Sequence, residues 1–180
     1  MGLKSVILEL LETVLTSVVV ILILYATVAS VEVVWGASME PNFFSDERIL
    51  VEKVTKYFKG YKRGDIVVLI PPEESDHYIK RVVGVPGDII KVFECNIYIS
   101  RDGEKYVLDE DYLADNTCTT GKTKIKEGRS IRVEEGQYVV LGDNRGVSVD
   151  SRSFGPVDEE RILGKVIFRF WPLPRLGFIN

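Results

Sequence analysis

Ser38 and Lys80 are the two residues of this sequence whose types could perform chemistry together. Ser38 lies in GASMEPN (36–42), where small residues before it and a proline after it predict a tight, exposed bend. Lys80 lies in YIKRVV (78–83), a short β-branched run that predicts a strand. A serine hydroxyl becomes a good nucleophile when a neighbouring base removes its proton, so such a pair could cleave an amide through an acyl-enzyme.

The lysine can act as that base only in its neutral form. At an ordinary pKa of about 10.4, roughly one lysine in 2,500 is neutral at pH 7, and burial lowers the pKa by disfavouring the ammonium. Alternation along the strand places Tyr78, Lys80 and Val82 on one face, with Ile79 and Arg81 on the other. The spacing of the serine and the lysine is no motif, and alone it favours a surface serine and an edge-strand lysine.

Composition narrows the other chemistry. The 180 residues carry 27 acidic and 23 basic side chains, a formal net charge of −4, and we find no basic stripe that would bind nucleic acid. One histidine and two cysteines are too few for a Cys/His zinc site. We therefore expect no metal, no cofactor and no nucleic-acid partner.

The single histidine, His77, suggests a Ser-His-Asp arrangement with Asp143 as an alternative. His77 is an odd number of positions from Lys80, so on a regular strand it would face away from the lysine. We expect it to begin the strand instead.

A run of 19 uncharged residues (13–31) precedes these segments. As a helix it would be about 28 Å long, close to the ~30 Å hydrocarbon core of a bilayer. A removable signal peptide is one alternative, because TVA (27–29) resembles a cleavage site, and a buried core helix is another. The run exceeds a usual signal-peptide apolar region, and Glu9 and Glu12 interrupt the positive charge expected before one, which favours a retained single-pass anchor.

Beyond the anchor, the sequence predicts strands. The candidate segments are short, rich in β-branched residues and separated by turn signals such as PGD (86–88). They are 31–35, 48–54, 65–70, 78–85, 88–93, 96–100, 130–133, 137–142 and 165–170. This series without alternating helices predicts a mainly β fold, an antiparallel sheet or barrel-like domain behind one N-terminal transmembrane helix.

The expected organisation is an N-terminal segment (1–31), with the anchor at about 13–31, followed by a β-rich domain (32–180). Residues 102–129 are polar and weakly patterned, which predicts an insertion on that domain. The spacing of Cys95 and Cys118 leaves both a disulfide and two free thiols open.

Four ordered boxes carry a resemblance to a known family. They are SMEP (38–41), RGDIV (63–67), YIKRVVGVPGD (78–88), and GDNR (142–145) followed by SVDSR (148–152). From about residue 13 to the C-terminus, the sequence closely resembles the bacterial type I signal peptidases, the leader peptidase family. The resemblance implies a membrane-anchored serine endopeptidase that removes signal peptides from exported preproteins. It also implies a cytoplasmic N-terminus, a catalytic domain outside the cytoplasmic membrane, and preproteins and the lipid bilayer as partners.

The same resemblance assigns roles to individual residues. Ser38 would be the nucleophile and Lys80 the general base, and the Ser148 hydroxyl would contact and orient the lysine amine. Structural support of the site falls to the charged side chains Asp143, Asp150, Arg152 and Arg81. The first substrate pocket would be lined by Val34, Met39, Phe43, Tyr78 and Ile79, and the third by Ile49 and Val68 with Val34 and Ile79.

Shallow apolar pockets of this kind would favour small residues such as alanine at substrate positions −1 and −3. The pocket residues could equally be ordinary core. Gly36 departs from many Gram-negative members, which carry a serine there whose hydroxyl helps bind the oxyanion, so another backbone donor or a water would assist the Ser38 N–H. Phe43, Phe44 and the segment 171–179 suggest an apolar rim against the bilayer, with core packing as the alternative.

Two other functions use the same residues. A self-cleaving repressor-type protease shares the Ser/Lys chemistry, but that class carries a DNA-binding segment and no bilayer span. A catalytically idle, membrane-tethered β domain is opposed by the joint presence of Ser38, Lys80 and Ser148.

Overall fold

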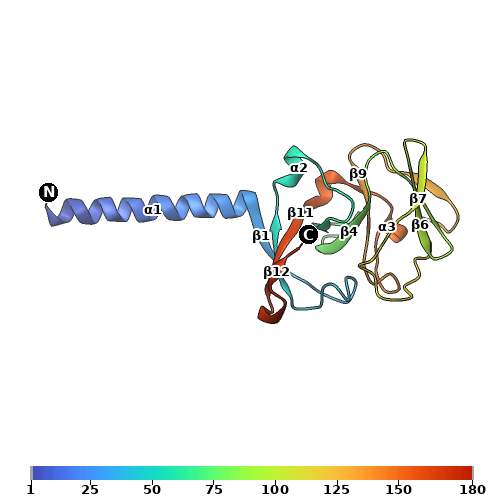
Figure 1. Ribbon diagram of the computed structural model, residues 1–180. Coiled ribbons are helices and arrows are strands. Elements are labelled where there is room, and N and C mark those ends of the chain that lie inside the picture. The colour runs from blue at the N-terminus through green and yellow to red at the C-terminus, as the bar shows by residue number, and fades with distance from the viewer. Residues whose placement is uncertain (1, 180) are drawn as a thin grey trace.

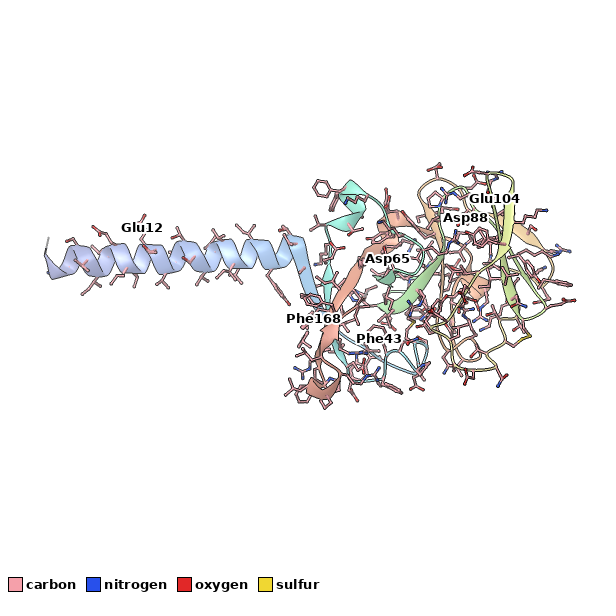
Figure 2. The ribbon with its side chains drawn as sticks, in the orientation of Figure 1. Glu12, Phe43, Asp65, Asp88, Glu104 and Phe168 are labelled. Atoms are coloured by element: carbon pink, nitrogen blue, oxygen red, sulfur yellow. A yellow bond between two sulfur atoms is a disulfide. The ribbon has the colours of Figure 1, made fainter. Side chains whose placement is uncertain are left out.

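The computed structural model describes residues 2–179 as one long helix followed by two antiparallel β-sheets (Figure 1). Helix α1 (Leu3–Val28) extends away from the β-domain, and the side chain of Glu12 projects outward from it (Figure 2). Its stretch Lys4–Ile23 is long and apolar enough to cross a membrane, and none of it is buried within the protein.

The helix and the predicted anchor differ at both ends. Helix α1 already begins at Leu3, and it ends at Val28 rather than at residue 31. The early end has a tertiary cause, because β1 (Ala29–Val33) pairs antiparallel with β2 (Arg48–Glu52). That long-range pairing turns the last residues of the uncharged run into an edge strand.

The larger sheet contains Lys80. Its order is β1-β2-β11-β3-β4-β9-β10, with β12 also paired to β11, and every pairing is antiparallel. Its further strands are β3 (Ile66–Leu69), β4 (Tyr78–Gly84), β9 (Gln137–Leu141), β10 (Val157–Asp158), β11 (Ile162–Trp171) and β12 (Gly177–Phe178). The expected mainly β, antiparallel fold is confirmed.

The smaller sheet lies at the end of the domain remote from α1 (Figure 1). Its order is β7-β6-β5-β8, formed by β5 (Ile89–Phe93), β6 (Asn96–Arg101), β7 (Glu104–Val107) and β8 (Ser130–Arg132). The polar segment 102–129 therefore supplies one regular strand, which its weak pattern did not predict. A disulfide joins Cys95 to Cys118 and ties the rest of this segment to the sheet.

Short helices connect the strands. They are α2 (Thr55–Phe58), α3 (Ser151–Phe154) and the 3-10 turns η1 (Glu159–Arg161) and η2 (Leu173–Arg175).

Three hydrophobic clusters form the core, and β4 contributes to each of them. Ile79 packs in the first cluster, Val83 in the second and Val82 in the third. Because β4 is buried along almost its whole length, the two charged side chains in its centre, Lys80 and Arg81, are buried as well. Buried charges are costly unless they are paired or neutralised, so this strand is where chemistry is expected.

The predicted apolar rim is only partly present. Phe43 is 1% exposed and packs in the first cluster, so it belongs to the core. Phe44, Trp171, Leu173 and Phe178 are exposed.

Candidate active site

The structure brings Ser38 and Lys80 together. The Lys80 Nζ lies 3.0 Å from the Ser38 Oγ, although the residues come from a bend after β1 and from the middle of β4. Gly36 makes that bend accessible, since its φ of +76° lies in the region that favours glycine. The Asn144 N–H fixes the other side of the bend by donating to the Ser38 carbonyl at 3.0 Å.

The surroundings of Lys80 suit a neutral amine. The side chain is 2% exposed, and its Nζ donates to the Ile79 carbonyl at 2.8 Å. Among residues 2–179, no carboxylate lies within ion-pair distance of this amine. Burial lowers the pKa of Lys80 to about 8, against the opposing fields of nearby carboxylates, chiefly that of Asp150. At such a pKa, about one-tenth of the amine is neutral at pH 7.

Arg81 is held by Asp143 in a buried ion pair. Arg81 Nη2 lies 2.7 Å from Asp143 Oδ2, and the guanidinium stacks over the Tyr112 ring at 3.9 Å. The same carboxylate accepts from Asn42 Nδ2 at 2.8 Å. Asp143 thus neutralises the arginine beside Lys80.

A Ser-His-Asp arrangement is not formed. His77 precedes β4, and its Nδ1 lies 3.2 Å from Glu32 Oε2, while the Asp143 carboxylate is held by Arg81. Within residues 2–179, no group of three His, Cys, Asp or Glu side chains is arranged to hold a metal ion.

Asp150 and Arg152 form a second ion pair with no solvent exposure. Arg152 Nη2 lies 2.7 Å from Asp150 Oδ2, and the Asp150 side chain caps the start of helix α3 by accepting the Arg152 N–H at Oδ1. Burial acts to raise the pKa of Asp150, but the bonds from Arg152 outweigh it and hold that pKa below its usual range. The pair also anchors the surrounding loop, because Arg152 Nη2 donates to the Arg145 carbonyl at 2.7 Å.

Ser148 lies beside the pair, and among residues 2–179 no hydrogen bond joins its hydroxyl to the lysine. Its hydroxyl is buried and near Asp150, whose pKa it helps to lower, although in the described part of the chain no partner meets full hydrogen-bond geometry with the Oγ. A Cβ placed on Gly142 would lie 2.2 Å from Ser148 Oγ and 2.4 Å from the Ser38 carbonyl oxygen. Glycine at 142 therefore allows Ser148 to approach the Ser38 bend closely.

A further set of contacts was not predicted from the sequence. Lys122 Nζ donates to the Ser148 carbonyl at 2.6 Å, and the buried Arg145 forms an ion pair with Glu110. Both partners from the polar segment thus hold the loop that carries Ser148. These pairs are separated by 26 and 35 positions, so no local pattern could have indicated them.

A cleft of about 850 Å³ leads to Ser38 and Lys80. Its walls are the segments 31–38 and 76–80, with Val147 and Val149 beside them. Five of the seven predicted substrate-binding residues line it: Val34, Ile49, Val68, Tyr78 and Ile79.

Met39 and Phe43 do not line the cleft. They are 0% and 1% exposed and lie in the hydrophobic cluster that backs the cleft wall. The bend after Ser38 turns both side chains into the core, the alternative that the sequence left open for the residues assigned by resemblance.

Arg152→Met is expected to lower the free energy of unfolding by about 3–5 kcal/mol, because it leaves the Asp150 carboxylate buried without its partner. Denaturant unfolding of the full chain in detergent measures this loss. The matched control is Arg132→Met, at an exposed position of β8, where a change within about 0.5 kcal/mol is expected. Equal changes in the free energy of unfolding at positions 152 and 132 would show that the ion pair does not stabilise the fold.

A buried amine lies within hydrogen-bond distance of a serine hydroxyl, and both residues line one cleft. This arrangement is that of a serine endopeptidase. Comparison with known proteins agrees. A family model described as signal peptidase, peptidase S26, matches residues 7–171. The chain belongs to this family, and its activity is the removal of signal peptides from secreted preproteins.

Several relatives align over nearly the full chain. Signal peptidase I of Bacillus licheniformis is 35% identical over 173 residues, which cover 94% of this chain and 91% of the relative. Signal peptidase IB of Staphylococcus aureus is 36% identical over 184 residues, covering 94% of each. The probable signal peptidase I-2 of Synechocystis is 35% identical over 179 residues, covering 96% of this chain and 77% of the relative.

Proposed function

We propose that this peptidase acts by acyl transfer to Ser38, with Lys80 as the general base. The neutral Lys80 amine takes the hydroxyl proton while Oγ attacks the scissile carbonyl. The resulting ammonium then returns the proton to the leaving amine, which departs with the mature protein. Lys80 next takes a proton from a water that attacks the acyl-enzyme, and Ser38 regains its proton when the signal peptide leaves. The distance of 3.0 Å between the buried amine and the hydroxyl carries this proposal.

The Ser38 N–H is the first donor for the oxyanion. Among residues 2–179 it has no hydrogen-bond acceptor, so it is available to a substrate oxygen. The hydroxyl that many relatives supply two residues earlier is absent at Gly36, and a water or second backbone donor takes its place.

Ser148 orients the lysine amine in this proposal. Among residues 2–179 its buried hydroxyl makes no hydrogen bond of full geometry, and its close approach to the Ser38 bend brings it near the residue that the amine contacts. A neutral partner suits this role, because a carboxylate there would hold the lysine protonated.

The substrate would lie extended along the cleft wall, with its main chain bonded to strand edges and alternate side chains in pockets. The side chains that line the cleft wall here are apolar or aromatic: Val34, Ile49, Val68, Tyr78 and Ile79. Small residues such as alanine at positions −1 and −3 fit pockets of this kind.

Helix α1 would anchor the enzyme in the cytoplasmic membrane by a single pass. An apolar stretch of this length matches a bilayer, and it lies outside the packed domain. The catalytic domain then stands on the extracytoplasmic side, where exported preproteins emerge and where the Cys95–Cys118 disulfide is permitted.

Incubation of the full chain in detergent with a preprotein carrying Ala-x-Ala before its mature part tests the specificity. The expected product begins immediately after the second alanine, as determined by N-terminal sequencing. Replacing the alanine at −1 by phenylalanine is the matched substrate control and is expected to stop cleavage. Equal cleavage of both preproteins would contradict the assigned pockets.

A further inference from the structure

The short helix α2 presents an aromatic pair that the catalytic account leaves without a role. Tyr57 and Phe58 are 73% and 79% exposed, among the most exposed large apolar side chains of the β-domain. Single exposed apolar residues are common on the surfaces of soluble proteins. Two adjacent aromatic rings at this exposure instead indicate a site that binds a membrane or another protein.

The segment that carries these rings is rich in basic residues. Residues 53–63 contain five basic side chains and no acidic one, although the whole chain has a net charge of −4. Lys59 and Lys62 are exposed, and Lys56 Nζ lies 5.1 Å from the centre of the Tyr57 ring. Lys56, Lys59 and Lys62 together with Tyr57 and Phe58 are called the basic-aromatic patch below.

The patch lies at the end of the domain from which α1 extends (Figure 1). The Lys53 N–H donates to the carbonyl of Val28, the last residue of α1, at 2.8 Å, and α2 begins two residues later. Glu52 Oε2 accepts the N–H groups of Val54 and Thr55, which fixes the start of α2. The rings are therefore held close to the point where the anchor meets the domain.

The length of the uncharged helix brings this end of the domain to the lipid surface. From Thr13, which follows Glu12, to Val28 the helix has 16 residues and spans about 24 Å, less than the ~30 Å hydrocarbon core. Carboxylates within the hydrocarbon are unfavourable, so Glu12 keeps to one interface and the domain is drawn toward the other. The domain surface beside Val28 then meets the headgroup layer.

We propose that the basic-aromatic patch docks on the headgroups of anionic phospholipids, as a second membrane contact beside α1. Tyr57 and Phe58 occupy the interface that aromatic rings favour, and the three lysines face lipid phosphates. Together, α1 and the basic-aromatic patch restrict rotation of the domain about the anchor. Because β1 forms part of the cleft wall, the cleft is then held at a fixed height above the lipid. This inference rests on the proposed single-pass anchor.

A fluorescent label in reconstituted vesicles tests the proposal without using peptidase activity. The full chain carries Phe58→Cys, the only free thiol because both native cysteines are paired, modified with an environment-sensitive fluorophore. Vesicles contain phosphatidylcholine alone or with phosphatidylglycerol, together with a doxyl-labelled quencher lipid. The matched control is Tyr106→Cys, an exposed aromatic position on β7 in the sheet remote from α1 (Figure 1).

The expected result is strong quenching at position 58 in vesicles with phosphatidylglycerol, weaker quenching without it, and no quenching at position 106. Replacing Lys56, Lys59 and Lys62 by glutamine should weaken the docked population by roughly fivefold per lysine and leave cleavage of a short peptide in detergent unchanged. Quenching at 58 no greater than at 106, or equal in the two lipid compositions, would overturn the proposal. Loss of peptide cleavage in the parent chain would instead contradict the proposed mechanism and leave the quenching result intact.

Discussion

Ser38→Ala is expected to abolish preprotein cleavage, with a fall in kcat of about 10⁶-fold, the scale seen when a serine peptidase loses its nucleophile. The loss follows because Ser38 Oγ is the hydroxyl that the Lys80 amine hydrogen-bonds within residues 2–179, where Nζ otherwise donates to the Ile79 carbonyl. A single-turnover assay with a purified preprotein measures it. The fold should remain intact, because the Ser38 side chain is only partly buried and supports no core cluster.

Ser130→Ala provides the control for the serine substitution. Ser130 lies at an exposed position of β8, in the smaller sheet, and its change should leave the cleavage rate unaltered. Near-normal turnover by Ser38→Ala would show that the acyl group is not carried by this hydroxyl.

Lys80→Met is expected to lower kcat by on the order of 10⁴-fold or more, because methionine fills the same space but cannot accept a proton. Lys80→Arg should fail equally, since a guanidinium remains protonated. The free energy of unfolding separates this role from a structural one, because loss of a structural lysine would destabilise the protein. Here the buried amine has no carboxylate partner, so Lys80→Met should retain or raise the free energy of unfolding while activity is lost.

Lys105→Met, at an exposed position of β7, is the matched lysine control, with unchanged activity expected. Activity of Lys80→Arg near that of the unsubstituted chain would contradict a neutral amine base.

The fold was largely predictable because its strands are short β-branched runs separated by glycine and proline turns. The same periodicity placed Lys80 and Arg81 on opposite faces of β4, and in the structure they have different partners, Ser38 and Asp143. The end of α1 was not predictable, because the residues after Val28 become a strand only through pairing with β2, about twenty positions away.

The candidate site was predictable only where neighbouring residues form recognisable boxes. The ion pair of Asp150 and Arg152 lies within one box, and the structure forms it. By contrast, Lys122 and Glu110 come from a segment that reads as a solvated insertion, and their contacts with the Ser148 loop arise only when the chain folds back. The placement of Met39 in the first pocket came from the family resemblance, and in the structure its side chain is buried behind the cleft wall.

The pH dependence of kcat/KM for an Ala-x-Ala peptide tests the catalytic role of Lys80 most directly, because this profile reports the ionisation of the essential base in the free enzyme. Burial lowers the pKa of Lys80 to about 8, and the neutral form is the active one. The rate should therefore rise about tenfold per pH unit on the acid side and level off above that pKa. A full rate already reached at about pH 5, far below the range in which a lysine of this kind loses its proton, would contradict the role assigned to the amine.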